Sequence, residues 1–216
     1  MVIKKGEIKA VIFDIGGVLS LGSLLKRPRK EGRPQAGAHE DIAKKFKVTM
    51  DQYFDAIDSV YADSIVGKIP KNKVLEIMAR NLKTTPRTLE KAYIKAYKAH
   101  FKKNKQLYNL AFKLKKKGYK IAILSDQNYM SEEVLAPKKL MDKFDVVVIS
   151  TQVKMRKPDP KIYNFVLKKL KLPAKSTVFI DNQKWNIIPA KKLEMKTILY
   201  QDYEQTKKEL EKLGVK

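Results

Sequence analysis

Four short apolar runs, each followed by polar residues, are the feature that most limits how this chain can fold. They cover residues 10–13, 119–124, 146–149 and 177–180 and are rich in β-branched side chains. Short continuous runs of this kind are typical of buried strands in a parallel sheet. Because segments with helical apolar spacing separate them, the sequence predicts right-handed βα units and an α/β fold, with a Rossmann-like, doubly wound parallel sheet as its core.

Reactive polar groups follow these runs. Asp14 comes directly after the first run, Ser125 after the second, and Asp181 and then Asn182 after the fourth, while Lys157 lies a few residues beyond the third. The carboxyl ends of parallel strands meet at one edge of a sheet, where open α/β sheets bind ligands, so these groups are predicted to converge there. Acids, a hydroxyl and an ammonium together suit an anionic substrate held with a divalent cation.

The long middle of the chain shows helical spacing and no strand-like run. Thr49 and Gln52 form a capping box, and Thr85 precedes a proline at the first position of another helix. We therefore predict that residues 20–102 are an all-helical insertion between the two parts of the core, 1–19 and 103–216. In the second core part we predict helices at 104–117, within 127–143, from 160 onward, at 186–193 and at 203–213, and a last strand at 196–199.

Composition adds a strong positive charge and excludes thiol chemistry. The 216 residues hold 47 Lys and Arg against 23 Asp and Glu, which gives a net charge of +24, and no Cys. Disulfides and thiolate metal sites are therefore excluded. The positive charge could bind nucleic acid weakly and without sequence specificity, above all through the basic, Pro- and Gly-containing segment 26–34. Alternatively, the lysines are simply solvated residues of the protein surface.

Two absences in the sequence bear on location. No apolar run is long enough to span a bilayer, and the first strand begins too early to leave room for a signal peptide. We therefore expect a cytoplasmic protein with no membrane partner. Nothing in the sequence sets the oligomeric state.

Taken in order, the motifs resemble those of the haloacid dehalogenase-like (HAD) hydrolase superfamily over nearly the whole chain. That superfamily places a nucleophilic Asp after its first strand, a Ser or Thr after a later strand, a Lys that often stands in Lys-Pro-Asp-Pro, and an acidic residue after a further strand. Asp14, Ser125, Lys157 and Asp181 match these positions. The resemblance implies that the helical insertion is a cap over the site.

The resemblance also implies a function and a role for each residue. It points to a Mg²⁺-dependent phosphomonoester hydrolase that acts on a small phosphorylated substrate through an aspartyl-phosphate intermediate. Asp14 would be the nucleophile, and Lys157 would hold nucleophile and phosphate together. The implied phosphate-binding residues are Ser125, Asp126, Gly16, Gly17 and Asn186, and the implied metal ligands are Asp14, the carbonyl of Gly16, Asp181 and Asn182.

Two positions depart from the superfamily pattern. Most of its phosphatases carry a second Asp, which acts as general acid and base, where this chain has Gly16, and relatives with paired acids have an acid in place of Asn182. Losing a general acid typically costs about a hundred- to ten-thousand-fold in rate, unless the leaving group is itself acidic. An anomeric sugar hydroxyl is such a group. Residues 155–158, 177–181 and Asn186 are also similar to the sugar-1-phosphate phosphatase branch, so a slow phosphatase of that type is expected.

Other functions remain open at this point. Gly16 and Asn182 fit a non-catalytic relative that binds a phosphorylated ligand or protein, and the charge fits a protein associated with nucleotides or nucleic acid. A dehalogenase would need no metal, and Asp181 argues against it. A receiver domain shares the acid, hydroxyl and lysine but has no inserted cap.

Several side chains have a structural alternative to a role in the site. Asp126 could cap a turn, and Asn186 could cap a helix beside the site rather than belong to it. Trp185 could cover the site, but it is expected to pack against the core or the cap. His39 and His100 have no metal-ligand spacing, so we predict that both lie at the surface.

Overall fold

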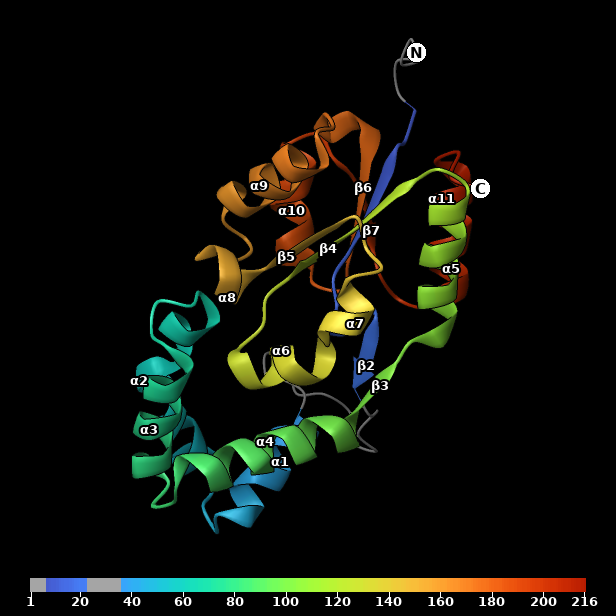
Figure 1. Cartoon of the computed structure of the whole chain (residues 1–216). Coiled ribbons are helices and arrows are strands. Elements are labelled where there is room, and N and C mark those ends of the chain that lie inside the picture. Colours follow the sequence, from blue (N-terminus) through green and yellow to red (C-terminus); the bar gives the residue numbers. More distant parts are fainter. Residues whose placement is uncertain (1–6, 23–35) are drawn as a thin grey trace.

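The computed structural model describes residues 7–22 and 36–216, so the basic segment 26–34 lies outside the described residues. Five parallel strands form the central sheet in the order β5-β4-β1-β6-β7 (Figure 1). The prediction of an α/β fold with a Rossmann-like parallel sheet is confirmed. The strand bounds are Ala10–Phe13 for β1, Lys120–Ser125 for β4, Val146–Ile149 for β5, Thr177–Asp181 for β6 and Lys196–Leu199 for β7.

Helices cover both faces of this sheet. Successive side chains of a strand point to opposite faces, and since the strands are apolar throughout, both faces must be buried. Val11 and Phe13 of β1 belong to one apolar cluster, and Ala10 and Ile12 belong to the other. The first cluster includes α5 and α11, and the second includes α9 and α10 (Figure 1). The bounds of these helices are Lys105–Lys116 for α5, Pro160–Leu170 for α9, Lys184–Lys192 for α10 and Tyr203–Lys212 for α11.

The order of the strands reverses at β1. Later strands add to β1 on one side through β4 and on the other through β6. In open α/β sheets, ligands bind beyond the carboxyl ends of the strands at such a point of reversal. The fold therefore favours a site next to Asp14 and Ser125.

Within the described residues 36–100, four helices occupy most of the segment, as predicted. They are α1 (Ala36–Lys45), α2 (Met50–Ile65), α3 (Lys71–Asn81) and α4 (Pro86–His100). The capping box of Thr49 and Gln52 is confirmed, as is the cap at Thr85 before Pro86. No helix of the described residues combines the length and apolar character that a membrane span requires.

The prediction that residues 20–102 contain helices only was wrong at both ends. Ser20–Gly22 forms β2, Phe101–Lys103 forms β3, and the two pair as an antiparallel ribbon. Strands of three residues are too short to show a period-two pattern, so their sequence carries no recognisable signal. The ribbon joins the helical segment to the core at two adjacent points (Figure 1).

Short helices complete the core, and two of them were not predicted. The region 127–143 holds α6 (Tyr129–Leu135) and α7 (Lys138–Met141). The unpredicted elements are α8 (Ser150–Val153) and the 3₁₀ turn η1 (Ala174–Ser176), which hold too few residues to show a periodicity. Helix α10 begins at Lys184, before the predicted start at 186.

The helical segment lies directly on the core. The hydroxyl of Tyr129 in α6 donates to the carbonyl of Ile69, at 2.9 Å. Gly67 has a φ of 61°, and a Cβ on it would collide with the carbonyl oxygen of Thr151. Only glycine combines this backbone conformation with such a close approach.

His39 and His100 are both partly buried, and each has a polar partner. The Nδ1 atom of His39 lies 2.7 Å from the hydroxyl of Tyr53, and this hydroxyl also contacts that of Tyr93. His100 keeps 23% of its side chain exposed and pairs with Asp41 at 2.8 Å. Burial lowers the pKa of His39 from its ordinary 6.5 to about 4. A single histidine has no periodicity of its own, so its sequence did not reveal this environment.

The low pKa of His39 predicts a loss of stability in acid. The unfolded chain takes up a proton near pH 6.5, whereas the folded chain resists it down to about pH 4. The stabilisation is therefore present above pH 6.5 and is lost as the pH falls toward 4, by up to about 3 kcal/mol. Urea unfolding of the wild type and His39→Gln at several pH values measures this loss. We expect a shallower decline in the variant, and parallel curves would contradict the prediction.

Candidate active site

The polar groups that follow the strands lie together at one edge of the sheet. The Nζ atom of Lys157 is 3.0 Å from Oδ1 of Asp14 and 2.7 Å from Oδ2 of Asp181. Lys157 is 2% exposed and Asp181 is fully buried. Since water is largely excluded, the three charges interact more strongly than they would at the surface. The convergence expected from the strand ends is therefore present.

Asp126 holds the loop that carries Lys157. Its Oδ1 atom accepts a hydrogen bond from the backbone N–H of Lys157 at 3.1 Å, and its Oδ2 atom lies 3.8 Å from Nε of Arg156. Burial raises the pKa of Asp126, although the charge and the N–H of Lys157 act against this rise. Asp126 thus positions the loop that carries Lys157, and its contact with substrate stays a prediction.

Asp181 accepts three hydrogen bonds from two groups in addition to the ammonium of Lys157. The backbone N–H of Gln183 donates to its Oδ1 atom at 2.7 Å. The side-chain amide of Asn186 donates to Oδ1 at 3.2 Å and to Oδ2 at 3.0 Å. Asn186 is itself fixed, because the hydroxyl of Tyr163 donates to its carbonyl at 2.8 Å. Asn186 therefore lies inside α10 and orients an acid of the site, and Gln183 takes the cap position.

Ser125 ends β4 with its side chain fully buried. Its Oγ atom accepts a hydrogen bond from Nε2 of Gln127 at 2.9 Å, and the backbone N–H of Gln127 donates to Oγ of Ser150 at 3.0 Å. A hydrogen bond from Ser125 also favours the ionised form of Asp14. The hydroxyl is thus placed beside the carboxylate and can donate to an anion.

Burial and the neighbouring charges shift the pKa values of both Asp14 and Lys157. Burial raises the pKa of Asp14 to about 6, and the charge of Lys157 limits this rise. For Lys157, burial alone would lower the pKa, but Asp14, Asp181 and Asp126 outweigh it, so the pKa lies well above its ordinary value. At neutral pH the site therefore holds an ionised carboxylate next to a permanent ammonium.

The two glycines after Asp14 differ in their surroundings. A Cβ on Gly16 would meet no atom within 4 Å. Gly17 has a φ of 82°, and a Cβ on it would collide with the side-chain amide of Asn182. The Oδ1 atom of Asn182 is buried and has no hydrogen-bond partner. An unpaired buried oxygen is costly unless a ligand satisfies it.

The donors of the site fit a magnesium ion. Carboxylates, an amide oxygen and backbone carbonyls are the hard oxygen ligands that Mg²⁺ prefers. Asp14, Asp181 and the unpaired Oδ1 of Asn182 supply such oxygens near the turn at Gly16. Within residues 7–22 and 36–216, no three His, Cys, Asp or Glu side chains are grouped closely enough to hold a metal ion by themselves.

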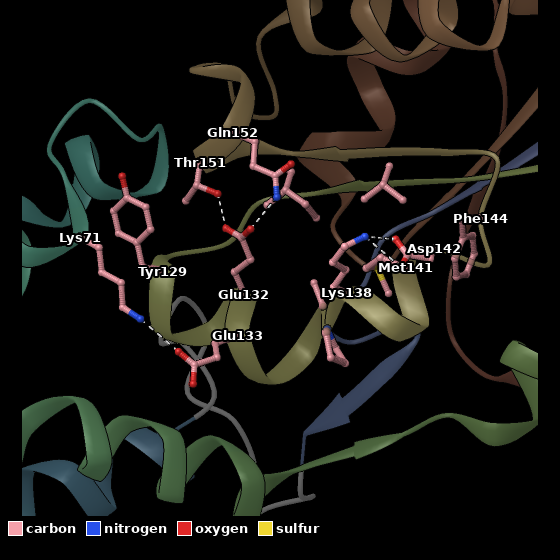
Figure 2. Close-up of a pocket in the computed structure, with 14 residues that line it drawn as sticks. Lys71, Tyr129, Glu132, Glu133, Lys138, Met141, Asp142, Phe144, Thr151 and Gln152 are labelled. Carbon is pink, nitrogen blue, oxygen red and sulfur yellow. Dashed lines mark hydrogen bonds and ion pairs between the residues drawn. The ribbon is translucent and has the colours of Figure 1, made fainter.

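A large cavity lies away from these groups. It has a volume of about 880 Å³ and lies between α6 and α7 on one side and β5 and α8 on the other (Figure 2). Its polar side chains pair with one another: Glu132 accepts from Thr151 and from Gln152, and Glu133 pairs with Lys71 at 3.1 Å. None of the strand-end groups lines it, so we assign it no catalytic role.

The packing prediction for Trp185 was wrong, since 60% of this residue is exposed. Helix α10 turns Asn186, Ile187 and Ala190 inward, and residues of a helix are spaced by 100°. Trp185 therefore falls on the outer side of the helix, as does Ile188, which is 47% exposed.

Known proteins are similar to this chain in fold or in sequence. A haloacid dehalogenase (HAD) family enzyme from Bacteroides thetaiotaomicron, crystallised with magnesium and inorganic phosphate, superposes with a TM-score of 0.72 at 20% identity, over 92% of this chain and 98% of that one. The bifunctional epoxide hydrolase 2 of Mus musculus is 28% identical over 95% of this chain, which spans only 39% of that relative. The (S)-2-haloacid dehalogenase 4A of Burkholderia cepacia is 33% identical over 40% of this chain and 38% of its own length.

The family assignment rests on a match that is longer than half of the chain. The family model described as haloacid dehalogenase-like hydrolase covers residues 35–200, which takes in Ser125, Lys157 and Asp181. The parallel sheet and the convergence of these groups on Asp14 agree with that match. The chain therefore belongs to the haloacid dehalogenase-like hydrolase family.

Proposed function

We propose that this hydrolase is a Mg²⁺-dependent phosphomonoester hydrolase that forms an aspartyl-phosphate on Asp14. The observation that carries the proposal is the buried ammonium of Lys157 between Asp14 and Asp181, with the unpaired oxygen of Asn182 nearby. A positive charge beside a nucleophilic carboxylate suits the transfer of an anionic phosphoryl group. The relative crystallised with magnesium and phosphate supports this choice of ligands.

Asp14 accounts for the phosphoryl transfer, and solvent supplies the proton. An oxygen of Asp14 attacks the phosphorus, the bond to the leaving oxygen breaks with its electron pair going to that oxygen, and water protonates it. Water then attacks the phosphorus of the aspartyl-phosphate, which releases phosphate and restores the carboxylate. Lys157 neutralises charge on the phosphoryl oxygens, and the hydroxyl of Ser125 donates to one of them. A Mg²⁺ ion held by Asp14, the Gly16 carbonyl, Asp181 and Asn182 would supply further neutralisation.

The glycine at position 16 limits which leaving groups the enzyme can release. With no acid at this position, the leaving oxygen departs without a proton from that residue. An acidic leaving group tolerates this best, because it is stable as an anion. We therefore propose a small phosphorylated metabolite with an acidic leaving group, such as a sugar 1-phosphate.

We also propose that residues 20–102 act as a cap over the site. The support is the direct contact of this segment with the core, at Gly67 against Thr151 and at Ile69 against Tyr129. A cap excludes water during transfer and supplies contacts to the leaving group. The ribbon of β2 and β3 connects the cap to the core by two neighbouring strands, about which the cap can open and close.

Asn182→Asp is expected to strengthen Mg²⁺ binding about tenfold, because it adds a charge to the metal ligands without changing their number or shape. Isothermal titration of Mg²⁺ into the wild type and the variant measures the change. Gln183→Glu adds the same charge at the next residue and serves as the control. Equal affinities of wild type and Asn182→Asp would mean that residue 182 does not bind the metal.

The proposed function is tested by phosphate release from a panel of sugar phosphates, nucleotides and p-nitrophenyl phosphate, with Mg²⁺ or with EDTA. The expected result is release that requires Mg²⁺ and is faster for anomeric phosphates and p-nitrophenyl phosphate than for phosphate esters of ordinary alcohols. Thermal stabilisation by these compounds without any release would instead support a non-catalytic binder. Halide release from a 2-haloacid in the presence of EDTA would support a dehalogenase, the activity in the name of the Burkholderia cepacia relative.

A further inference from the structure

Asn104 is a buried polar residue at the point where the helical segment returns to the core. It follows β3 directly and is the N-cap of α5, and only 6% of it is exposed (Figure 1). Its Oδ1 atom accepts a hydrogen bond from the backbone N–H of Leu107 at 3.3 Å, as the side chain of an N-cap does. Capping uses only the oxygen of the amide, so the nitrogen, with its two N–H groups, is available for other contacts.

Both N–H groups of the Asn104 side chain are used, and they reach different parts of the core. The Nδ2 atom donates to the carbonyl of Val18 at 3.0 Å and to the hydroxyl of Tyr200 at 2.9 Å. A carbonyl can only accept and the N–H of Leu107 can only donate, so these partners fix the orientation of the amide. Val18 and Tyr200 are 86 and 96 residues away along the chain. One side chain therefore joins three segments that are far apart in sequence.

The contact with Val18 holds the turn that follows β1. The backbone N–H of Asn104 also donates to the carbonyl of Leu19 at 2.9 Å, so a single residue fixes two successive carbonyls of this turn. The turn closes on itself as well, because the N–H of Gly17 donates to the carbonyl of Ser20 at 2.8 Å. This is the turn whose backbone supplies the carbonyl that the proposed function assigns to the metal.

The contact with Tyr200 leads to the second acid of the site. Tyr200 follows β7, and its backbone N–H donates to the carbonyl of Asp181 at 2.9 Å. Asp181 is the last residue of β6 and is fully buried. The amide of Asn104 thus connects, in two directions, the strand ends that carry Asp14 and Asp181.

We propose that Asn104 is a positioning residue of the metal site, which holds the turn after Asp14 in place relative to the strand end at Asp181. The inference rests on the proposed function and deepens it, because the ligands assigned to Mg²⁺ come from these two segments. Mg²⁺ requires nearly ideal octahedral geometry, so a small shift of one ligand weakens its binding. Since Asn104 also follows the β2–β3 ribbon directly, the core end of the cap connection is held by the same amide.

Asn104→Ser tests the proposal, because serine still caps α5 but is too short to reach Val18 or Tyr200. We expect the affinity for Mg²⁺ to fall by about tenfold or more, which is typical when a partner behind the metal ligands is lost. Tyr200→Phe removes one of the two contacts and should cause a smaller fall. Thr85→Ala removes the exposed N-cap of α4 and should leave the affinity unchanged, although it also destabilises a helix. Isothermal titration of Mg²⁺ and thermal unfolding of each variant measure these effects.

The outcomes separate a positioning role from a merely structural one. If Asn104→Ser unfolds at a lower temperature but binds Mg²⁺ as the wild type does, Asn104 is only a helix cap and the proposal is overturned.

If the wild type itself binds no Mg²⁺, the proposed function fails, and hydrogen exchange then tests the positioning of the turn. The N–H groups of Gly17 and Ser20 should exchange about tenfold faster or more in Asn104→Ser, relative to amides within β4, and Thr85→Ala should leave their exchange unchanged. Equal exchange of these two groups in Asn104→Ser and the wild type would refute the proposal.

Discussion

Replacing Asp14 with asparagine is expected to abolish phosphate release, with a loss of at least about 10⁴-fold in kcat. The amide has the shape of the carboxylate, but it lacks the charged oxygen that would attack phosphorus. Its loss also removes one of the two acids next to Lys157. Release of inorganic phosphate from the best substrate of the panel, at saturating Mg²⁺, measures the effect.

The controls for this substitution separate chemistry from folding. Asp58→Asn removes the same charge from an exposed position of α2 and should retain wild-type rates. Thermal unfolding of Asp14→Asn shows whether it still folds cooperatively. If the folded variant keeps a tenth or more of wild-type activity, the nucleophile lies elsewhere and the aspartyl-phosphate mechanism is wrong.

Gly16→Asp is expected to increase activity, which is unusual for a substitution in a catalytic site. The position has open space, since a Cβ would meet no atom within 4 Å, and its φ lies outside the left-handed range. A carboxyl group there could protonate the leaving oxygen and then activate water. Such general acid–base catalysis typically contributes about a hundred- to ten-thousand-fold.

The increase should depend on the leaving group, which gives the prediction its sharpest test. Phosphate esters of ordinary alcohols should gain most, and p-nitrophenyl phosphate, whose leaving group is already acidic, should gain little. Gly16→Asn fills the same space without an acid and should give no gain. Gly17→Asp should be harmful, because of its φ of 82° and the collision with Asn182. A uniform change across substrates would show that the new carboxyl group does not act as an acid.

The main lines of the fold followed from sequence because the strands are short, apolar and β-branched, and because polar residues end them. The same pattern placed Asp14, Ser125 and Asp181 correctly, since a parallel sheet brings the carboxyl ends of its strands together. Lys157 was the harder case. It lies eight residues beyond the end of β5, and its position depends on the hydrogen bond from its backbone to Asp126.

What sequence did not reveal was mostly a matter of environment. The unpaired oxygen of Asn182, the open space at Gly16 and the burial of His39 depend on neighbours that are distant along the chain. Nucleic-acid binding through segment 26–34 stays a prediction, and loss of salt-dependent retention on RNA after neutralising that segment would test it.

The single lysine shared by two acids has a thermodynamic consequence. Asp14, Asp181 and Lys157 leave one unit of negative charge in a buried space, so a phosphate dianion entering alone would raise that excess to three units. Such an excess is costly away from water. A divalent cation entering with the phosphate would leave the charge as it was. Ester and cation are therefore expected to bind as an electroneutral pair, each raising the affinity for the other by the same factor.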